Sequence, residues 1–147
     1  MSWTARKTVV VPVDFSEASI KAVDVARNFV QDVSQIHVIH VARDLNPVDP
    51  AILLGNVNVS DRRERLRESL EQRFAREEDR GINIRLELGN PGLEIVLYAS
   101  RIGADLIVMP SHGRTGISRI ALGSVAERVT RHATCPVLIL RGEERQG

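Results

Sequence analysis

The chain is poor in the residues that cross-link small proteins or bind metals in them. It has a single cysteine, Cys135, which cannot form an intrachain disulfide and supplies no cluster of metal ligands. Cys135 precedes Pro136 beside an apolar run, so we interpret it as a buried bystander rather than a reactive thiol. His37 and His40 lie three residues apart on a predicted strand, where they point to opposite faces and cannot hold one metal ion together.

An excess of charge of one sign and long apolar runs are also missing. The 20 Lys and Arg residues nearly balance the 19 Asp and Glu residues, and the formal net charge is +1. This balance gives no indication of a nucleic-acid partner. No stretch approaches the roughly 18 apolar residues that a membrane-spanning helix needs, and the first residues hold no signal-peptide core. We therefore expect a cytoplasmic protein with no nucleic-acid or membrane partner.

Two common nucleotide-binding motifs are absent as well. The sequence contains no GxxxxGK[ST] motif with its phosphate-binding lysine and no G-x-G-x-x-G motif. We therefore predict neither an efficient ATPase nor a dinucleotide oxidoreductase. There is no internal repeat or low-complexity segment, and 147 residues with 43% apolar content fit one globular domain over residues 1–147.

What the chain does have is an alternation of short apolar runs with helical patterns. The β-branched run at residues 8–13 lacks polar alternation, which is typical of a strand buried on both faces of a parallel sheet. Residues 82–88 alternate apolar and polar side chains and predict an edge strand. Further strands are expected at residues 36–41, 105–109 and 137–140.

Helical patterns separate these strands. Ser16 is a good N-cap for the first helix, and residues 59–80 predict a charged second helix that Gly81 ends. Asn90 and Pro91 have the pattern of an N-cap followed by proline at the first helical position. The predicted buried side of that third helix consists of Leu93, Val96, Leu97 and Ala99.

The resulting β-α-β-α-β-α-β-α-β order predicts an α/β fold. We expect a single doubly wound, five-stranded parallel sheet in the order 3-2-1-4-5, with helices on both faces. Strand order reverses between the first and fourth strands, where ligands of such sheets bind at the carboxyl ends of the strands. Asp14 follows the first strand and lies at this crevice. Its carboxylate either contacts a ligand or binds backbone N–H groups of its own turn, and both interpretations stay open.

Residues 104–141 form the most informative stretch, a strand, a loop, a helix and a strand. Ser124 and Glu127 fit a capping box at the helix start. The loop before the helix supplies little bulk and two positive charges through Gly113, Gly116, Gly123, Arg114 and Arg119. A helix start of this kind suits an anion such as phosphate. An ordinary βαβ loop that needs glycines for its turns explains the same spacing equally well.

Three segments resemble a known protein family. They are VVVPVDFSEAS at residues 9–19, IHVIHV at residues 36–41 and SHGRTGISRIALGSVAERV at residues 111–129, followed by CPVLIL. The resemblance is to the universal stress protein family and covers essentially the whole chain. The ATP-binding branch of that family has a Gly-two-Gly-nine-Gly-Ser/Thr loop. Gly113 and Gly123-Ser124 match this loop, and Pro110 occupies the first glycine position.

The resemblance implies that the chain binds ATP, with Mg²⁺ on its phosphates, at the predicted crevice. The residues implied at the adenine and ribose end are Pro12, Val13, Asp14, Val41 and Met109. The residues implied along the phosphates are Ser111, His112, Gly113, Arg114, Gly123, Ser124 and Val125. ATP would then order the loops at residues 42–58 and 110–120, and this ordering would be the signal of a stress-response module.

Pro110 leaves two outcomes open. Its ring either hinders the ribose or, because proline fixes φ, stiffens the loop and lowers the entropy lost on ordering. In the first case the chain is a nucleotide-independent, dimeric interaction protein of the same fold. A slow phosphohydrolase is a third function, with His112 as acid or base and Ser124 as nucleophile. Neither side chain has an evident activating partner in the sequence, so we assign no enzymatic activity.

The final apolar run, Val137–Leu140, is expected at or near an edge of the sheet. Its open N–H and C=O groups can pair with a strand from another chain. With the family resemblance, this implies a homodimer in which these strands pair antiparallel across a two-fold axis.

Overall fold

Five parallel strands form one sheet in the order β3-β2-β1-β4-β5. The computed structural model describes residues 5–43, 48–56, 58–112 and 122–142. The strands are β1 (Val9–Pro12), β2 (Ile36–Ala42), β3 (Asn83–Leu88), β4 (Leu106–Pro110) and β5 (Val137–Leu140). The predicted doubly wound sheet and its strand order are confirmed.

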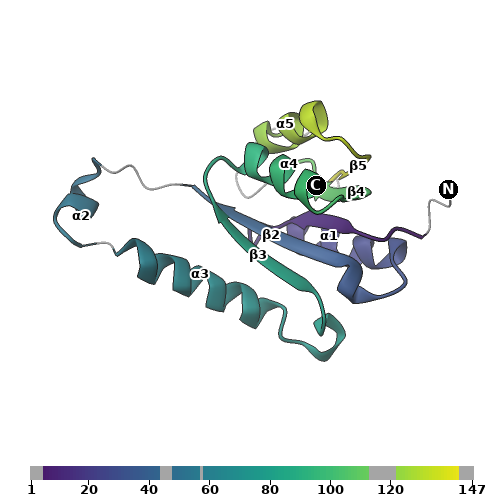
Figure 1. The fold of residues 1–147 in the computed structure, drawn as a ribbon, viewed down its shortest axis with the longest axis horizontal. Helices are drawn as coiled ribbons and strands as arrows, with labels where there is room; N and C mark the ends of the chain where they lie inside the picture. Colours follow the sequence, from purple (N-terminus) through teal and green to yellow (C-terminus); the bar gives the residue numbers. More distant parts are fainter. Residues whose placement is uncertain (1–4, 44–47, 57, 113–121, 143–147) are drawn as a thin grey trace, which may run out of the picture.

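Helices cover both faces of this sheet (Figure 1). They are α1 (Glu17–Ala26), α2 (Pro50–Leu53), α3 (Val59–Arg73), α4 (Pro91–Arg101) and α5 (Ser124–His132). α1 and α3 pack on one face, and α4 and α5 pack on the other. Among the helices described, none combines the length and the apolar character that crossing a membrane requires.

Each face of the sheet has its own core. Buried members of the first core include Val9, Val11, Val13, Ala22, Val23, Leu70 and Phe74. Buried members of the second core include Val10, Ile39, Ile95, Tyr98, Ile107, Met109, Ala126 and Val129. Side chains alternate along a strand, so neighbouring valines of β1 enter different cores. Val9, Val10 and Val11 are each 0% exposed, as predicted for a strand covered on both faces.

Two predicted helix starts are confirmed. The Ser16 hydroxyl accepts a hydrogen bond from the Ser19 amide at 3.2 Å and caps α1. The Asn90 side chain accepts one from the Leu93 amide at 3.2 Å, and Pro91 is the first residue of α4. Both caps satisfy N–H groups that have no partner inside the helix.

The second long helix ends earlier than predicted. α3 stops at Arg73, and the short 3₁₀ helix η3 (Glu77–Asp79) follows, so Gly81 does not end α3. Phe74 at the C-cap is only 6% exposed and packs in the first core. The continuous charge pattern of residues 59–80 therefore covers a helix, a turn and a second, shorter helix.

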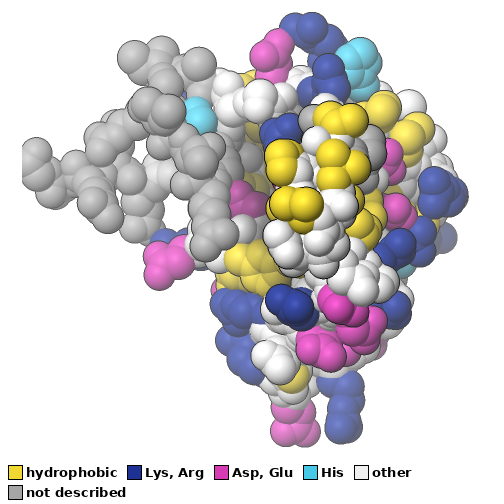
Figure 2. Space-filling model, turned by 90° about the vertical axis from the view of Figure 1, so that its left-hand side faces the viewer, with side chains coloured by type: hydrophobic (Ala, Val, Ile, Leu, Met, Phe, Trp, Pro, Cys, Tyr) yellow, Lys and Arg dark blue, Asp and Glu magenta, His cyan; other side chains and the backbone are white. Residues whose placement is uncertain are grey.

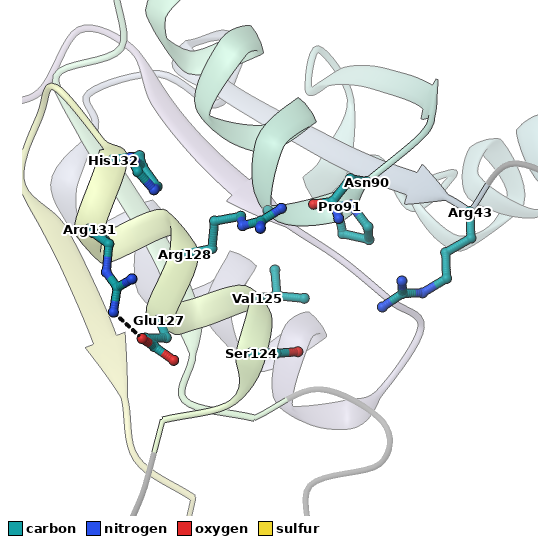
Figure 3. Close-up of a pocket in the computed structure, with 10 residues that line it drawn as sticks. Arg43, Asn90, Pro91, Ser124, Val125, Glu127, Arg128, Arg131 and His132 are labelled. Atoms are coloured by element: carbon teal, nitrogen blue, oxygen red, sulfur yellow. Dashed lines mark hydrogen bonds and ion pairs between the residues drawn. The ribbon is translucent and has the colours of Figure 1, made fainter.

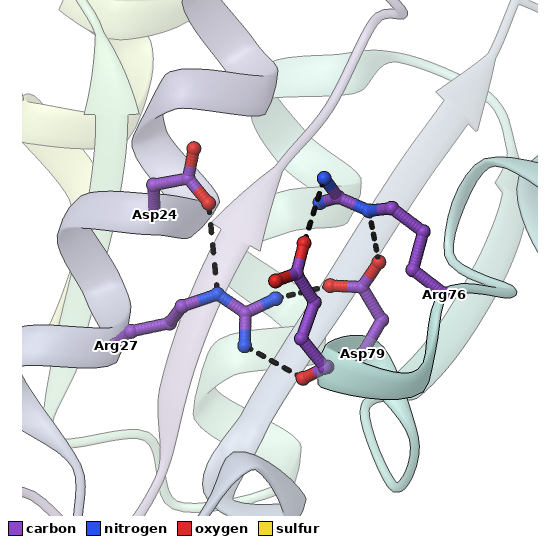
Figure 4. A network of polar contacts seen from close by, with 5 residues as sticks. Asp24, Arg27, Arg76 and Asp79 are labelled. Carbon is purple, nitrogen blue, oxygen red and sulfur yellow. Dashed lines mark hydrogen bonds and ion pairs between the residues drawn. The ribbon is translucent and has the colours of Figure 1, made fainter.

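Asp79 ties η3 to the end of α1 (Figure 4). Its side chain has no exposed surface and accepts a hydrogen bond from the guanidinium of Arg27. Its Oδ2 accepts another from Nε of Arg76 at 3.0 Å, and Arg27 also donates to the Glu78 carbonyl at 2.9 Å. A carboxylate this deeply buried is stable only when it is paired and hydrogen-bonded.

The buried side of α4 differs from the prediction. Leu93 is 49% exposed and Leu97 is 45% exposed. The predicted Ala99 is buried in the second core and Val96 is partly buried against it, but Ile95 and Tyr98 are buried there in place of the two leucines. α4 has two apolar stripes, and periodicity alone does not tell which one meets the sheet. Gly92 lies three residues before Ile95 on the buried stripe, where it lets α5 approach closely.

His37, His40 and Cys135, to which the sequence analysis gave no metal-binding or catalytic role, are each partly buried. His37 Nδ1 lies 3.1 Å from the Tyr98 hydroxyl, and burial lowers the pKa of His37. His40 extends to the other face, where its Nδ1 lies 2.7 Å from the Val13 carbonyl oxygen. Cys135 is half-buried beside the second core, and this burial raises the pKa of its thiol. A raised pKa lowers the thiolate fraction and agrees with an unreactive cysteine.

The long connection after β2 contains α2, which projects from the sheet together with the start of α3 (Figure 1). Leu53, the last residue of α2, is 69% exposed, and Leu54, which follows it, is 74% exposed. Figure 2 shows hydrophobic side chains gathered over this helix. A lid or contact surface in this connection stays a prediction.

Candidate functional site

The turn after β1 holds Asp14 at the carboxyl edge of the sheet. Its Oδ1 accepts hydrogen bonds from the Ser16 amide at 3.0 Å and the Ser16 hydroxyl at 2.5 Å. The turn-stabilising role that the sequence left open is therefore present. Phe15, between these residues, has a φ of 66°, which non-glycine residues seldom adopt. Strained backbone of this kind is found preferentially at functional sites.

Val13 faces away from the other predicted site residues. Its side chain is 4% exposed and packs in the first core. Its amide donates to the Ile39 carbonyl at 2.8 Å, and its carbonyl contacts His40. Val13 therefore holds the turn in place through contacts within the protein.

Val41, Met109 and Val125 lie on the opposite face of the sheet, in the second core. Met109 is buried in the second core, and Val41 and Val125 are partly buried against that core. Pro12, the last residue of β1, is buried and pairs with Ile39. Pro12 is two residues after Val10, so alternation places it on the same face as the second core. The fold thus places apolar residues from β1, β2, β4 and α5 on one face of the sheet.

The start of α5 corrects one prediction. Gly123 is the N-cap, Ser124 is the first helical residue, and no described side chain caps the helix. Glu127 instead pairs with Arg131 at 2.5 Å, so the predicted capping box is wrong. The helix begins where the Gly123 amide donates to the Ser111 carbonyl at 2.8 Å, and this tertiary contact replaces a local cap.

Gly123 stands where a side chain would not fit easily. A Cβ at this position would lie 3.1 Å from the Ser111 carbonyl oxygen and 3.5 Å from His112 Cα. The glycine therefore serves the contact between α5 and the end of β4. Ser111 and His112 lie beside the helix start, with Ser111 Oγ 3.1 Å from His112 Nδ1. The predicted loop residues Gly113, Arg114, Gly116 and Arg119 lie outside the described residues.

An open pocket of about 430 Å³ lies between the first turn of α4 and the length of α5, beside the end of β2 (Figure 3). Its walls include Arg43, Gly92, Ser124, Val125, Arg128 and Arg131. We call it the basic pocket. Ser124 and Val125 belong to the predicted phosphate-binding set, so the basic pocket adjoins the predicted site.

The positive charge of the basic pocket is only partly balanced. Arg131 is paired with Glu127, which also lines the pocket. Within the described part of the chain, Arg43 and Arg128 have no such ion pair. Figure 3 shows their guanidinium groups entering the pocket from opposite sides. Such a pocket raises the local concentration of anions.

The sequence analysis missed Arg43 and Arg128. Arg43 follows Val41 by two residues, a spacing that places side chains on one face of a strand, and Arg128 follows Ser124 by about one helical turn. These spacings were readable in the sequence. The packing of α4 against α5, which brings the two arginines to one pocket, could not be read from the sequence.

A doubly wound parallel sheet with a pocket at its carboxyl edge defines the class of α/β domains that place ligands where strand order reverses. A model of the Universal stress protein family matches residues 5–141, and the chain belongs to this family. Universal stress protein MJ0531 of Methanocaldococcus jannaschii is 35% identical over 95% of this chain and 85% of its own length. Universal stress protein YxiE of Bacillus subtilis is 32% identical over 90% of this chain and 97% of its own length.

Solved structures of relatives have the same fold. That of hypothetical protein MJ0577 has a TM-score of 0.77 and 28% identity, and the match covers 94% of this chain and 97% of that chain. A universal stress protein in complex with cAMP has a TM-score of 0.59 and 27% identity, over 93% and 98% of the two chains. The Archaeoglobus fulgidus protein in complex with dAMP has a TM-score of 0.55 at 22% identity, over 91% and 97%, and shows likeness of fold.

Proposed function

We propose that this chain is a single-domain regulatory module of the stress response that binds an adenine nucleotide, with ATP as the expected ligand. The observation that carries the proposal is that Val41, Met109 and Val125 share one face of the sheet and that Val125 also lines the basic pocket. Apolar side chains suit a purine ring, and a few polar and charged groups at the rim suit its phosphates. The relative in complex with cAMP supports an adenine nucleotide as the ligand class.

We assign the base, the ribose and the phosphates of the nucleotide to different residues at the carboxyl edge. Pro12, Val41 and Met109 supply the apolar wall for the base. Asp14, oriented by Ser16, accepts hydrogen bonds from the ribose. The phosphates follow Ser111, His112, Gly123, Ser124 and Val125, and the proposal extends this series to Gly113 and Arg114.

We propose that Mg²⁺ binds together with ATP. Mg²⁺ usually keeps several waters and is held through the phosphates of its nucleotide. Among the described residues, no three His, Cys, Asp or Glu side chains come together in a way that could hold a metal ion. The phosphate oxygens and water are therefore the ligands that we assign to it.

Asp14→Ala tests the proposal against a matched variant, Asp32→Ala. The Asp32 carboxylate accepts a hydrogen bond from the Ser34 amide at 2.8 Å in the same kind of turn, but at the amino edge, before β2. Calorimetry with protein freed of bound nucleotide should show that Asp14→Ala weakens ATP binding at least about tenfold. Asp32→Ala should leave it unchanged.

Two results would contradict the proposal. A wild-type protein that binds no adenine nucleotide rules it out directly. Equal losses of affinity in the two variants would show that the Asp14 carboxylate acts through stability rather than through the ligand.

Pro110 connects this proposal to the nucleotide-independent alternative. It is the buried last residue of β4 and pairs with Leu140, so its ring lies in the strand that leads to the loop. Pro110→Gly should leave ATP affinity unchanged or lower it if the proline stiffens the loop. ATP binding that appears only in Pro110→Gly would favour the interaction protein.

We further propose a homodimer formed through β5. In the described part of the chain, β5 pairs only with β4, and its residues are half-buried Val, Leu and Ile. A second copy of the strand would pair with the open N–H and C=O groups of β5 and would cover these side chains. Light scattering at micromolar concentration should give a dimer mass that Ile139→Lys converts to a monomer mass. Leu97→Lys, on the exposed side of α4, should leave the dimer intact, and a monomeric wild-type chain would contradict the proposal.

A further inference from the structure

The basic pocket contains more positive charge than its own carboxylate balances. Its lining has three arginines, Arg43, Arg128 and Arg131, against one glutamate, Glu127. Glu127 pairs with Arg131 at 2.5 Å, which leaves two guanidinium groups without a carboxylate partner among the described residues. Like charges that share a pocket repel each other, and an anion between them removes the repulsion.

Arg128 is positioned by close packing. A Cβ at position 92 would lie 2.6 Å from Arg128 Cδ and 2.9 Å from its Cβ, so the arginine stem rests on the bare backbone of Gly92. Figure 3 shows the guanidinium crossing from α5 toward Asn90 and Pro91 at the start of α4. A side chain already held in this way loses less conformational entropy when it binds a ligand.

Arg43 enters the pocket from the opposite side. It is the first residue after β2, and its carbonyl accepts a hydrogen bond from the Arg62 guanidinium at 3.2 Å. Its side chain points toward Val125 (Figure 3). Ser124 and Val125, which belong to the predicted phosphate-binding set, line the same pocket as both guanidinium groups.

We infer that Arg43 and Arg128 bind the outer phosphate groups of the nucleotide, so that affinity rises with the number of phosphates. This inference rests on the proposed function and adds two residues to the phosphate-binding set, with the consequence that a nucleoside polyphosphate binds more tightly than a monophosphate. The planar guanidinium group forms paired, charge-assisted hydrogen bonds with phosphate oxygens. Arg131 takes no part, because Glu127 already engages it.

Calorimetry with AMP, ATP and inorganic tripolyphosphate tests the inference. Arg43→Gln and Arg128→Gln should each weaken ATP and tripolyphosphate binding about tenfold and leave AMP binding within about twofold. Arg131→Gln is the matched control, because it removes a charge from the same pocket and should change none of the three affinities. All three side chains are exposed, so the variants should fold, and their thermal midpoints check this.

Gly92→Ala is a second and independent variant. It keeps every charge but pushes the Arg128 stem away from its position. It should weaken ATP and tripolyphosphate binding and spare AMP. An unchanged preference for ATP over AMP in this variant would contradict the positioning of Arg128 by Gly92.

The possible failures are distinguishable. If adenine nucleotides bind but the arginine variants lose nothing, or lose AMP and ATP equally, the inference is wrong and nucleotide binding stands. If tripolyphosphate binds and no nucleotide does, the proposed function is wrong and so is the ligand assigned to these arginines. If neither binds, both are overturned.

Discussion

The amino and carboxyl edges of the sheet differ in whether their charged side chains are paired. At the amino edge, charged side chains bind other charged side chains or backbone N–H groups of the protein. Asp79 is buried between Arg27 and Arg76 (Figure 4). The Asp105 carboxylate accepts hydrogen bonds from the amides of Lys7 and Thr8, at 3.0 and 3.2 Å. These contacts join segments that enter the sheet, so their charges hold the fold together.

At the carboxyl edge, two arginine side chains are exposed to the solvent. Arg43 and Arg128 line a pocket without a carboxylate partner in the described chain, and Phe15, in the turn after β1, has a strained φ of 66°. Neither feature adds to stability. Groups that a fold leaves unbalanced in a pocket are candidates for a site, whereas balanced buried groups are candidates for a structural role.

The largest expected effect tests the amino edge. Asp79→Ala leaves two arginines without their buried partner and should lower the free energy of unfolding by about 3 kcal/mol. Urea unfolding monitored by circular dichroism measures it. Glu78→Ala is the matched control. Glu78 pairs with Arg76 at 2.7 Å but its side chain is 60% exposed, so we expect a loss below about 0.5 kcal/mol. Equal losses in both variants would contradict a structural role that is specific to Asp79.

A smaller effect concerns His37, the second residue of β2. Burial lowers its pKa in the folded chain below the unfolded value of about 6.5. Between these two pKa values the unfolded chain binds more protons, so the free energy of unfolding falls as pH drops through that window. Urea unfolding at about pH 7.5 and 5.5 should show the fall, and His37→Gln should reduce it. His132→Gln, with an exposed side chain, should not reduce it.

The smallest expected effect tests the carboxyl edge. Replacing Arg43 and Arg128 together by Gln should change the free energy of unfolding by less than about 0.5 kcal/mol. A slight gain is consistent with the relief of repulsion between the two groups. A loss of more than about 1 kcal/mol would show that these arginines hold the fold, and the contrast between the two edges would disappear.

Sequence reasoning succeeded where the signal is local. The unalternated valines of β1 and the alternation of residues 82–88 identified a central and an edge strand. It failed where two local solutions compete. The two stripes of α4 look alike in sequence, and contact with α5 selected the one that contains Ile95. The capping box at Ser124 fitted its motif, but the Gly123–Ser111 contact set the helix start one residue earlier.

The candidate site divides in the same way. The sequence located the carboxyl edge and Asp14, because strand order and crossover handedness limit where ligands of such a sheet bind. It did not separate Val13 from its neighbours, since the turn after β1 directs that side chain into the first core. Arg43 and Arg128 were missed because no motif joins residues so far apart in the chain.

The sequence by itself indicated the family and determined the strand order, and it predicted the edge at which a ligand would bind. The family follows from sequence resemblance, whereas the strand order follows from periodicity, capping and handedness, which act over short stretches of chain. Only the tertiary structure decided that Asp79 is buried between two arginines and that Arg43 faces Arg128 across a pocket. These contacts depend on how closely segments that are distant in sequence pack together. At Gly92, for example, the absence of a side chain leaves room for the stem of Arg128. No local sequence pattern indicates how close two such segments come.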